Sequence, residues 1–112
     1  MKDFLFLFRG GEPSANLSPA QVQQRMQKWT TWIQDLSKAG KFKSGYPLEN
    51  AAKVVSGKNR LVTDGPFAES KEGVGGYLIV AAGDLADAAD VAKGCPIFEE
   101  GGAVEVRPIM PM

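Results

Sequence analysis

The sequence predicts an α+β domain in which an antiparallel sheet carries two helices on one of its faces. Three observations lead to this prediction. Two apolar runs, at residues 4–8 and 77–82, are typical of buried strands. A long segment after Ser18 repeats apolar side chains at helical spacing. Residues 104–109 alternate apolar and polar side chains, as a half-exposed strand does.

The first half of the chain predicts a strand, a helix and a short irregular strand. The run from Phe4 to Phe8 is apolar throughout, so we expect a central strand or one buried on both faces. Ser18, followed by Pro19 at the first helical position, begins the helix, and Gly40 ends it. The stripe of this helix that faces the sheet contains Val22, Met26, Trp29, Trp32, Ile33 and Leu36. A glycine and a proline within residues 42–48 predict a short or edge strand there.

The second half predicts a hairpin, the second buried strand, a helix and a final strand. Residues 51–55 and 60–63 are the two strands of the hairpin, and residues 56–59 are its turn. Asp84 caps a helix that runs from about Leu85 to Lys93. The simplest topology for this order is ferredoxin-like, with the hairpin as an insertion. Helices would cover one face of the sheet, and a back-to-back homodimer would cover the other.

Length and composition narrow the class of protein. The 112 residues fit a single domain, 1–112, and 44% hydrophobic with 23% charged residues is ordinary for a soluble globular protein. A net charge of zero argues against a nucleic-acid partner. No apolar run is long enough to span a membrane. The first apolar run is very short, Arg9 follows it and no cleavage pattern is present, so we expect a cytoplasmic protein.

The chain contains no histidine, which removes the commonest general base and the usual imidazole zinc sites. Its one cysteine, Cys95, follows the end of a predicted helix, where the helix dipole opposes a thiolate. We therefore interpret Cys95 as structural and expect neither a metal nor an organic cofactor. Any acid–base chemistry would fall to carboxylates, lysine, tyrosine or the single thiol.

The segment from Thr63 to Glu72 is the most informative part of the chain. Asp64 precedes a stiff Gly-Pro turn, where a carboxylate often accepts backbone hydrogen bonds. The alternative is a carboxylate that lies in a cleft and orients a ligand or acts as a catalytic acid or base. Glu69 follows closely, and two facing carboxylates would form an acid–base pair.

Three further residues complete the candidate ligand-binding set. Trp29 belongs to it because tryptophan is rarely fully buried in a small domain and can line the mouth of a cavity. Arg107 belongs to it because a guanidinium can hold an anionic ligand. Tyr77 begins the second buried strand, close in sequence to the Asp64 segment.

Several motifs appear in a characteristic order: Trp29-Thr-Thr-Trp32, Thr63-Asp64-Gly65-Pro66-Phe67-Ala68-Glu69, Lys71-Glu72, Gly75-Gly76-Tyr77, Cys95-Pro96 and Glu105-Val106-Arg107-Pro108. Together they resemble the YCII-related family, in its DGPF-domain branch, over almost the whole chain. The resemblance implies a dimeric α/β-barrel, that is, two ferredoxin-like units whose sheets face each other. It also implies a link to alternative sigma factors of the extracytoplasmic type, because members of this branch resemble proteins encoded beside such factors.

The wider family is thought to include enzymes with a His-Asp pair, whose histidine lies on the first helix. Here that region reads Gln27-Lys28-Trp29-Thr30, so the pair is missing even if Asp64 is its aspartate. The first prediction is therefore a homodimeric ligand-binding or regulatory module for a small molecule. The alternatives are an enzyme on a small organic substrate that uses Asp64 as general acid or base, and a pure protein-interaction partner.

Overall fold

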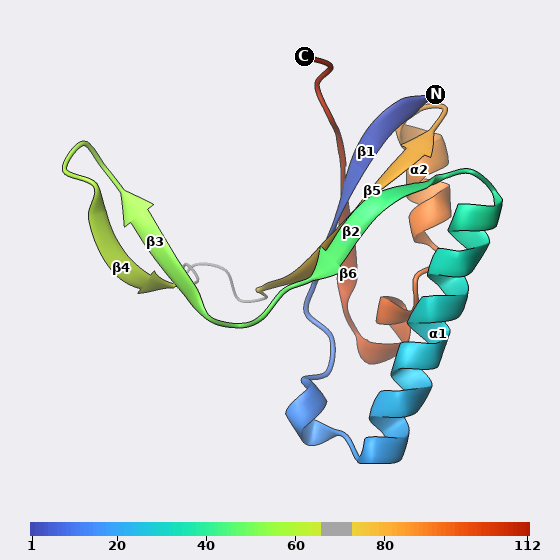
Figure 1. The fold of residues 1–112 in the computed structure, drawn as a ribbon, viewed down its shortest axis with the longest axis horizontal. Coiled ribbons are helices and arrows are strands. Elements are labelled where there is room, and N and C mark those ends of the chain that lie inside the picture. Colours follow the sequence, from blue (N-terminus) through green and yellow to red (C-terminus); the bar gives the residue numbers. More distant parts are fainter. Residues whose placement is uncertain (66–72) are drawn as a thin grey trace.

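The computed structural model describes residues 1–65 and 73–112, and it contains a sheet with helices on one side. Four strands form an antiparallel sheet in the order β2-β5-β1-β6. Their bounds are Lys2–Arg9 for β1, Phe42–Pro47 for β2, Val74–Ala82 for β5 and Ala103–Pro108 for β6. The helices α1 (Pro19–Lys38) and α2 (Leu85–Ala92) lie on one side of this sheet (Figure 1). This ferredoxin-like order confirms the predicted fold class.

The predicted hairpin is present as an insertion between β2 and β5. Its strands are β3 (Ala52–Ser56) and β4 (Leu61–Gly65), which form a separate two-stranded sheet. We call residues 52–65 the arm. Figure 1 shows the arm projecting from the main sheet on the side away from α1 and α2. The radius of gyration is 15.6 Å, whereas a compact chain of this length has about 13 Å.

Local signals in the sequence explain where both helices begin. Ser18 and Gln21 form a capping box before α1, in which each side chain accepts a hydrogen bond from the other residue's backbone amide, at 3.2 and 2.9 Å. Asp84 caps α2 by accepting a hydrogen bond from the amide of Asp87 at 2.8 Å. Gly40, in the left-handed region with φ of 73°, lies just beyond the end of α1. Both predicted helix starts are confirmed.

The core lies between the sheet and the helices, and aromatic rings dominate it. Every second residue of β1 is buried there, namely Phe4, Phe6 and Phe8. Phe6 is stacked with Trp32 at 6.5 Å between ring centroids, and Phe8 meets Trp29 edge to face at 4.9 Å. The central position of β1 is as predicted. Within the described residues one of its faces is buried, whereas Leu5 and Leu7 on the other face are half-buried.

Two short 3₁₀ segments had no counterpart in the sequence prediction. η1 (Ser14–Asn16) precedes α1, and η2 (Pro96–Glu100) connects α2 to β6. Within residues 1–65 and 73–112, neither α1 nor α2 combines the length and the hydropathy that crossing a bilayer requires.

Candidate functional site

Among residues 1–65 and 73–112, no helix lies on the second face of the main sheet, and we call this face the open face. Side chains alternate along a strand, so the residues between the buried phenylalanines point to this face. Its members on the three strands β1, β5 and β6 include Leu5, Leu7, Arg9, Tyr77, Ile79, Glu105 and Arg107. The register places Leu7 opposite both Tyr77 and Glu105, and Leu5 opposite both Ile79 and Arg107. The open face therefore has an aliphatic centre between an aromatic side and a charged side.

The charged side of the open face consists of two arginines that share one carboxylate. Arg9 donates a hydrogen bond from Nε to Oε1 of Glu105 at 3.1 Å, and an Arg107 guanidinium nitrogen lies 3.8 Å from the other oxygen. Two cations with one anion leave a surplus positive charge. Because the Arg107 side chain is 67% exposed, its guanidinium can receive an anionic group.

The aromatic side of the open face is a pair of tyrosines on adjacent strands. Tyr46 of β2 lies opposite Tyr77 of β5, with ring centroids 6.4 Å apart and planes at 60°. Tyr46 is exposed and Tyr77 is half-buried. Tyr77 was in the predicted site, whereas Tyr46 was not, because the sequence does not reveal which residue of an irregular edge strand pairs with it.

Asp64 lies in strand β4 of the arm and not in a turn. Its carboxylate is 87% exposed and forms an ion pair with Lys53 of β3, with Nζ and Oδ1 2.6 Å apart. The two residues are cross-strand partners in the register of the hairpin. Asp64 therefore lies on an open surface of the arm in the single chain, where it supports strand pairing.

The predicted site residues do not converge in one chain. Tyr77 and Arg107 share the open face, and Asp64 lies on the arm. Trp29 packs against the core on the opposite, helix-covered side of the sheet, in edge-to-face contact with Trp32 and Phe8. Glu69 lies outside the described residues.

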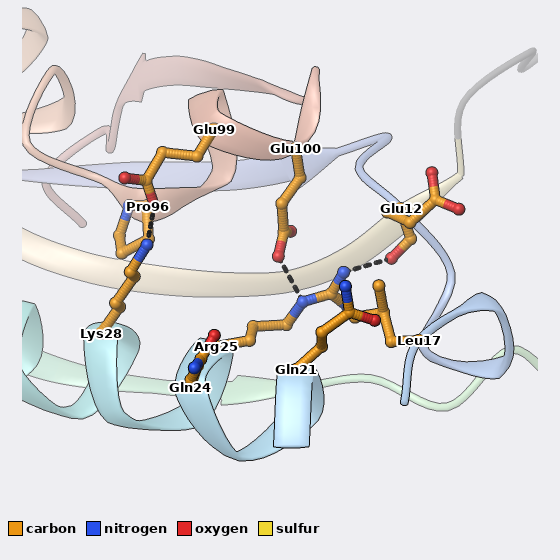
Figure 2. Close-up of a pocket in the computed structure, with 9 residues that line it drawn as sticks. All are labelled: Glu12, Leu17, Gln21, Gln24, Arg25, Lys28, Pro96, Glu99 and Glu100. Atoms are coloured by element: carbon orange, nitrogen blue, oxygen red, sulfur yellow. Dashed lines mark hydrogen bonds and ion pairs between the residues drawn. The ribbon is translucent and has the colours of Figure 1, made fainter. Parts of the chain in front are cut away.

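The structure also contains a charged cleft that the sequence analysis missed. It has a volume of about 410 Å³ and lies between α1, η2 and the loop after β1. Arg25 lies in it, forming an ion pair with Glu100 and donating a hydrogen bond to the backbone oxygen of Glu12 at 2.7 Å (Figure 2). Lys28 and Glu99 form a second pair at its rim, at 3.1 Å. Both basic side chains of the cleft are paired with glutamates of η2, and Arg25 also contacts the loop. These interactions therefore hold η2 and the loop against α1.

Cys95 is buried, in agreement with its predicted structural position. Its side chain belongs to the core between sheet and helices. Burial raises the pKa of this thiol from 9.0 to about 12, the charge of Glu100 adds to the rise, and a hydrogen bond from the Ile97 backbone opposes it. The thiol therefore stays protonated near neutral pH. Among the residues that the structure describes, no three His, Cys, Asp or Glu side chains are grouped as metal ligands.

Comparison with protein families identifies the domain. The sequence model of the YCII-related domain matches residues 4–112, which is nearly the whole chain. No curated protein matches the sequence.

Proposed function

Since the chain belongs to the family of the YCII-related domain, we propose that it acts as a homodimeric module that binds a small organic anion. The observation that carries this proposal is the composition of the open face. An aliphatic centre formed by Leu5, Leu7 and Ile79 is not covered by either helix of the described part of the chain. A second copy, packed sheet to sheet, would remove this apolar surface from water.

The edges of the same face support binding of an anion. Arg107 and Arg9 flank a single carboxylate, that of Glu105, so one positive charge remains for a ligand. The tyrosine pair at the other side provides aromatic rings for an apolar part of the ligand. A small molecule with a carboxylate or phosphate group and an apolar portion fits this combination.

We also assign the chain to the DGPF-domain branch. The assignment rests on the tetrapeptide from Asp64 to Phe67 and on the other motifs that accompany it in the sequence. On that assignment, a regulatory setting beside a sigma factor is the biological context that we propose. The catalytic alternative has less support, because the carboxylate of Asp64 lies on an exposed surface in the single chain.

The proposal is tested first by the mass of the protein in solution. Light scattering on a size-exclusion column is expected to give a dimer, and Leu7→Asp is expected to give a folded monomer, because a buried charge has no partner there. Thermal-shift screening of small carboxylates and phosphates should then find ligands that stabilise the dimer, by an amount that rises with concentration.

Arg107→Gln is expected to remove that thermal shift while the dimer persists. The matched control is Lys93→Gln on the helix side, because Lys93 is also an exposed cation paired with a carboxylate, at 3.1 Å. A monomeric wild-type protein, or a thermal shift that Arg107→Gln leaves unchanged, would contradict the proposal.

A further inference from the structure

The arm exposes apolar side chains in an unusual proportion for its size. Val55, Leu61 and Val62 are 62%, 63% and 57% exposed. Val55 and Val62 are cross-strand partners on one face of the hairpin, and alternation places Leu61 on the other face. Aliphatic side chains therefore lie on both faces of a two-stranded sheet.

Such a hairpin is poorly stabilised by its own contacts. A two-stranded sheet is marginal in water unless a third strand or another layer covers it. β3 and β4 pair only with each other within the part of the chain that the structure describes. The outer edges of both strands thus present unpaired backbone groups to solvent, which is a typical site of association with another chain.

The position of the arm indicates which surface could cover its exposed apolar side chains. The arm projects on the side of the sheet away from the helices, the side to which the open face points (Figure 1). A second copy of the chain that packs on the open face would therefore lie next to the arm of the first copy. In a two-fold dimer, each arm would then extend along the other copy.

The area of the open face also favours this arrangement. The four strands have 6 to 9 residues each, which gives the sheet a footprint of about 460 Å². A stable interface of standard size buries about 800 Å² on each partner. One face of the arm adds about 160 Å², so an interface that includes the arm comes closer to that size.

We propose that the arm of each protomer packs on the partner copy and forms part of the dimer interface. This inference rests on the proposed homodimer and adds to it a second contact region. It also gives Asp64 a place between the two copies, because the Lys53–Asp64 ion pair lies on the same face of the arm as Val55 and Val62. A site that includes Asp64 would then require both copies.

The experiment compares dimer dissociation constants measured by analytical ultracentrifugation. The test variant is Leu61→Thr combined with Val62→Thr, because threonine keeps the preference for a strand and removes the apolar contact. The matched control is Met26→Gln on α1. The prediction that Met26 faces the sheet was wrong, because its side chain is 64% exposed on the helix side. The arm variant is expected to raise the dissociation constant at least about tenfold, whereas the control leaves it unchanged.

Amide hydrogen exchange on the unmodified protein provides a second measurement. Protection of residues 52–65 is expected to rise with protein concentration across the dissociation constant, because dimerisation covers the arm. The arm contact would be overturned, and the dimer retained, by two results together. The arm variant would leave the dissociation constant unchanged, and protection of the arm would not change with protein concentration. A wild-type monomer would overturn the dimer and the arm contact together.

Discussion

The two faces of the main sheet use the same strands for different purposes. On β1, the side chains that point to the helices are three phenylalanines, and they are almost completely buried. The side chains between them are Leu5 and Leu7, which remain half-buried on a face edged by arginines and tyrosines. One face holds the single chain together, while the other is the face on which our proposal places the partner copy. Substitutions on the two faces should therefore differ in kind.

The largest effect is expected for Phe6→Ala on the helix-covered face. Phe6 is completely buried and stacked with Trp32, so the substitution should lower the free energy of unfolding by about 3–5 kcal/mol. Its neighbour supplies the control, because Leu7→Ala should cost about 1 kcal/mol in dilute protein and more as the concentration rises. Urea denaturation at two protein concentrations measures both. The two faces would not differ in kind if each variant lost the same free energy of unfolding at both protein concentrations.

A second test uses Cys95, which lies on the helix-covered side. The unfolded thiol ionises near pH 9, whereas burial raises the pKa to about 12 in the folded protein. Its contribution to stability is thus complete below pH 9 and is lost as the pH rises toward 12, by about 1.4 kcal/mol per pH unit. Denaturation of wild type and Cys95→Ala between pH 8 and 11 isolates this dependence. Two parallel pH profiles would show that the thiol ionises equally in both states.

A third test concerns the charged cleft at the edge of the helix layer. Arg25→Met keeps the apolar stem but removes the ion pair with Glu100 and the hydrogen bond to Glu12, and should cost about 1–3 kcal/mol. Lys28→Met removes the neighbouring, exposed pair with Glu99 and should change stability by at most about 0.5 kcal/mol. Thermal unfolding of both variants provides the comparison. The prediction that Arg25 contributes more than Lys28 would be contradicted if Lys28→Met lowered the stability as much as Arg25→Met.

The smallest effect is expected on the arm, where Arg60 adopts a left-handed backbone conformation with φ of 55°. Glycine has no steric cost in this region, so Arg60→Gly should stabilise the turn by up to about 1 kcal/mol. Exchange protection of the hairpin amides in dilute protein measures the gain. Reduced protection would show that the arginine side chain itself stabilises the turn.

Much of the fold could be predicted because its signals are local. Ser18 with Pro19, and Asp84 before its helix, fix the helix starts through hydrogen bonds within one turn. The apolar runs identify the central strands, and the alternation in the last segment identifies a strand with one exposed face. The 3₁₀ segment η2 was missed because it depends on its position between α2 and β6 and has no periodic signal of its own.

The candidate site was harder to predict because it depends on which way side chains point. Trp29 and Tyr77 were both predicted as ligand-binding residues, yet their side chains lie on opposite faces of the sheet. Asp64 looked like a turn former from its neighbours Gly65 and Pro66, but the hairpin register extends through Gly65 and pairs Asp64 with Lys53. Sequence proximity to a turn does not reveal where strand pairing ends.

The pairing of β1 with β6 has a mechanical consequence. The two strands are antiparallel neighbours, and the amide of Ile109 donates a hydrogen bond to the backbone oxygen of Asp3 at 3.0 Å, so the first and last segments lie together at one end of the sheet (Figure 1). A force that pulls these two ends apart acts along the hydrogen bonds of the ladder, which lie perpendicular to the strands. The bonds would then break one after another, starting at Asp3. The chain should therefore unzip at low force when it is stretched from its ends, however stable its aromatic core is to heat or denaturant.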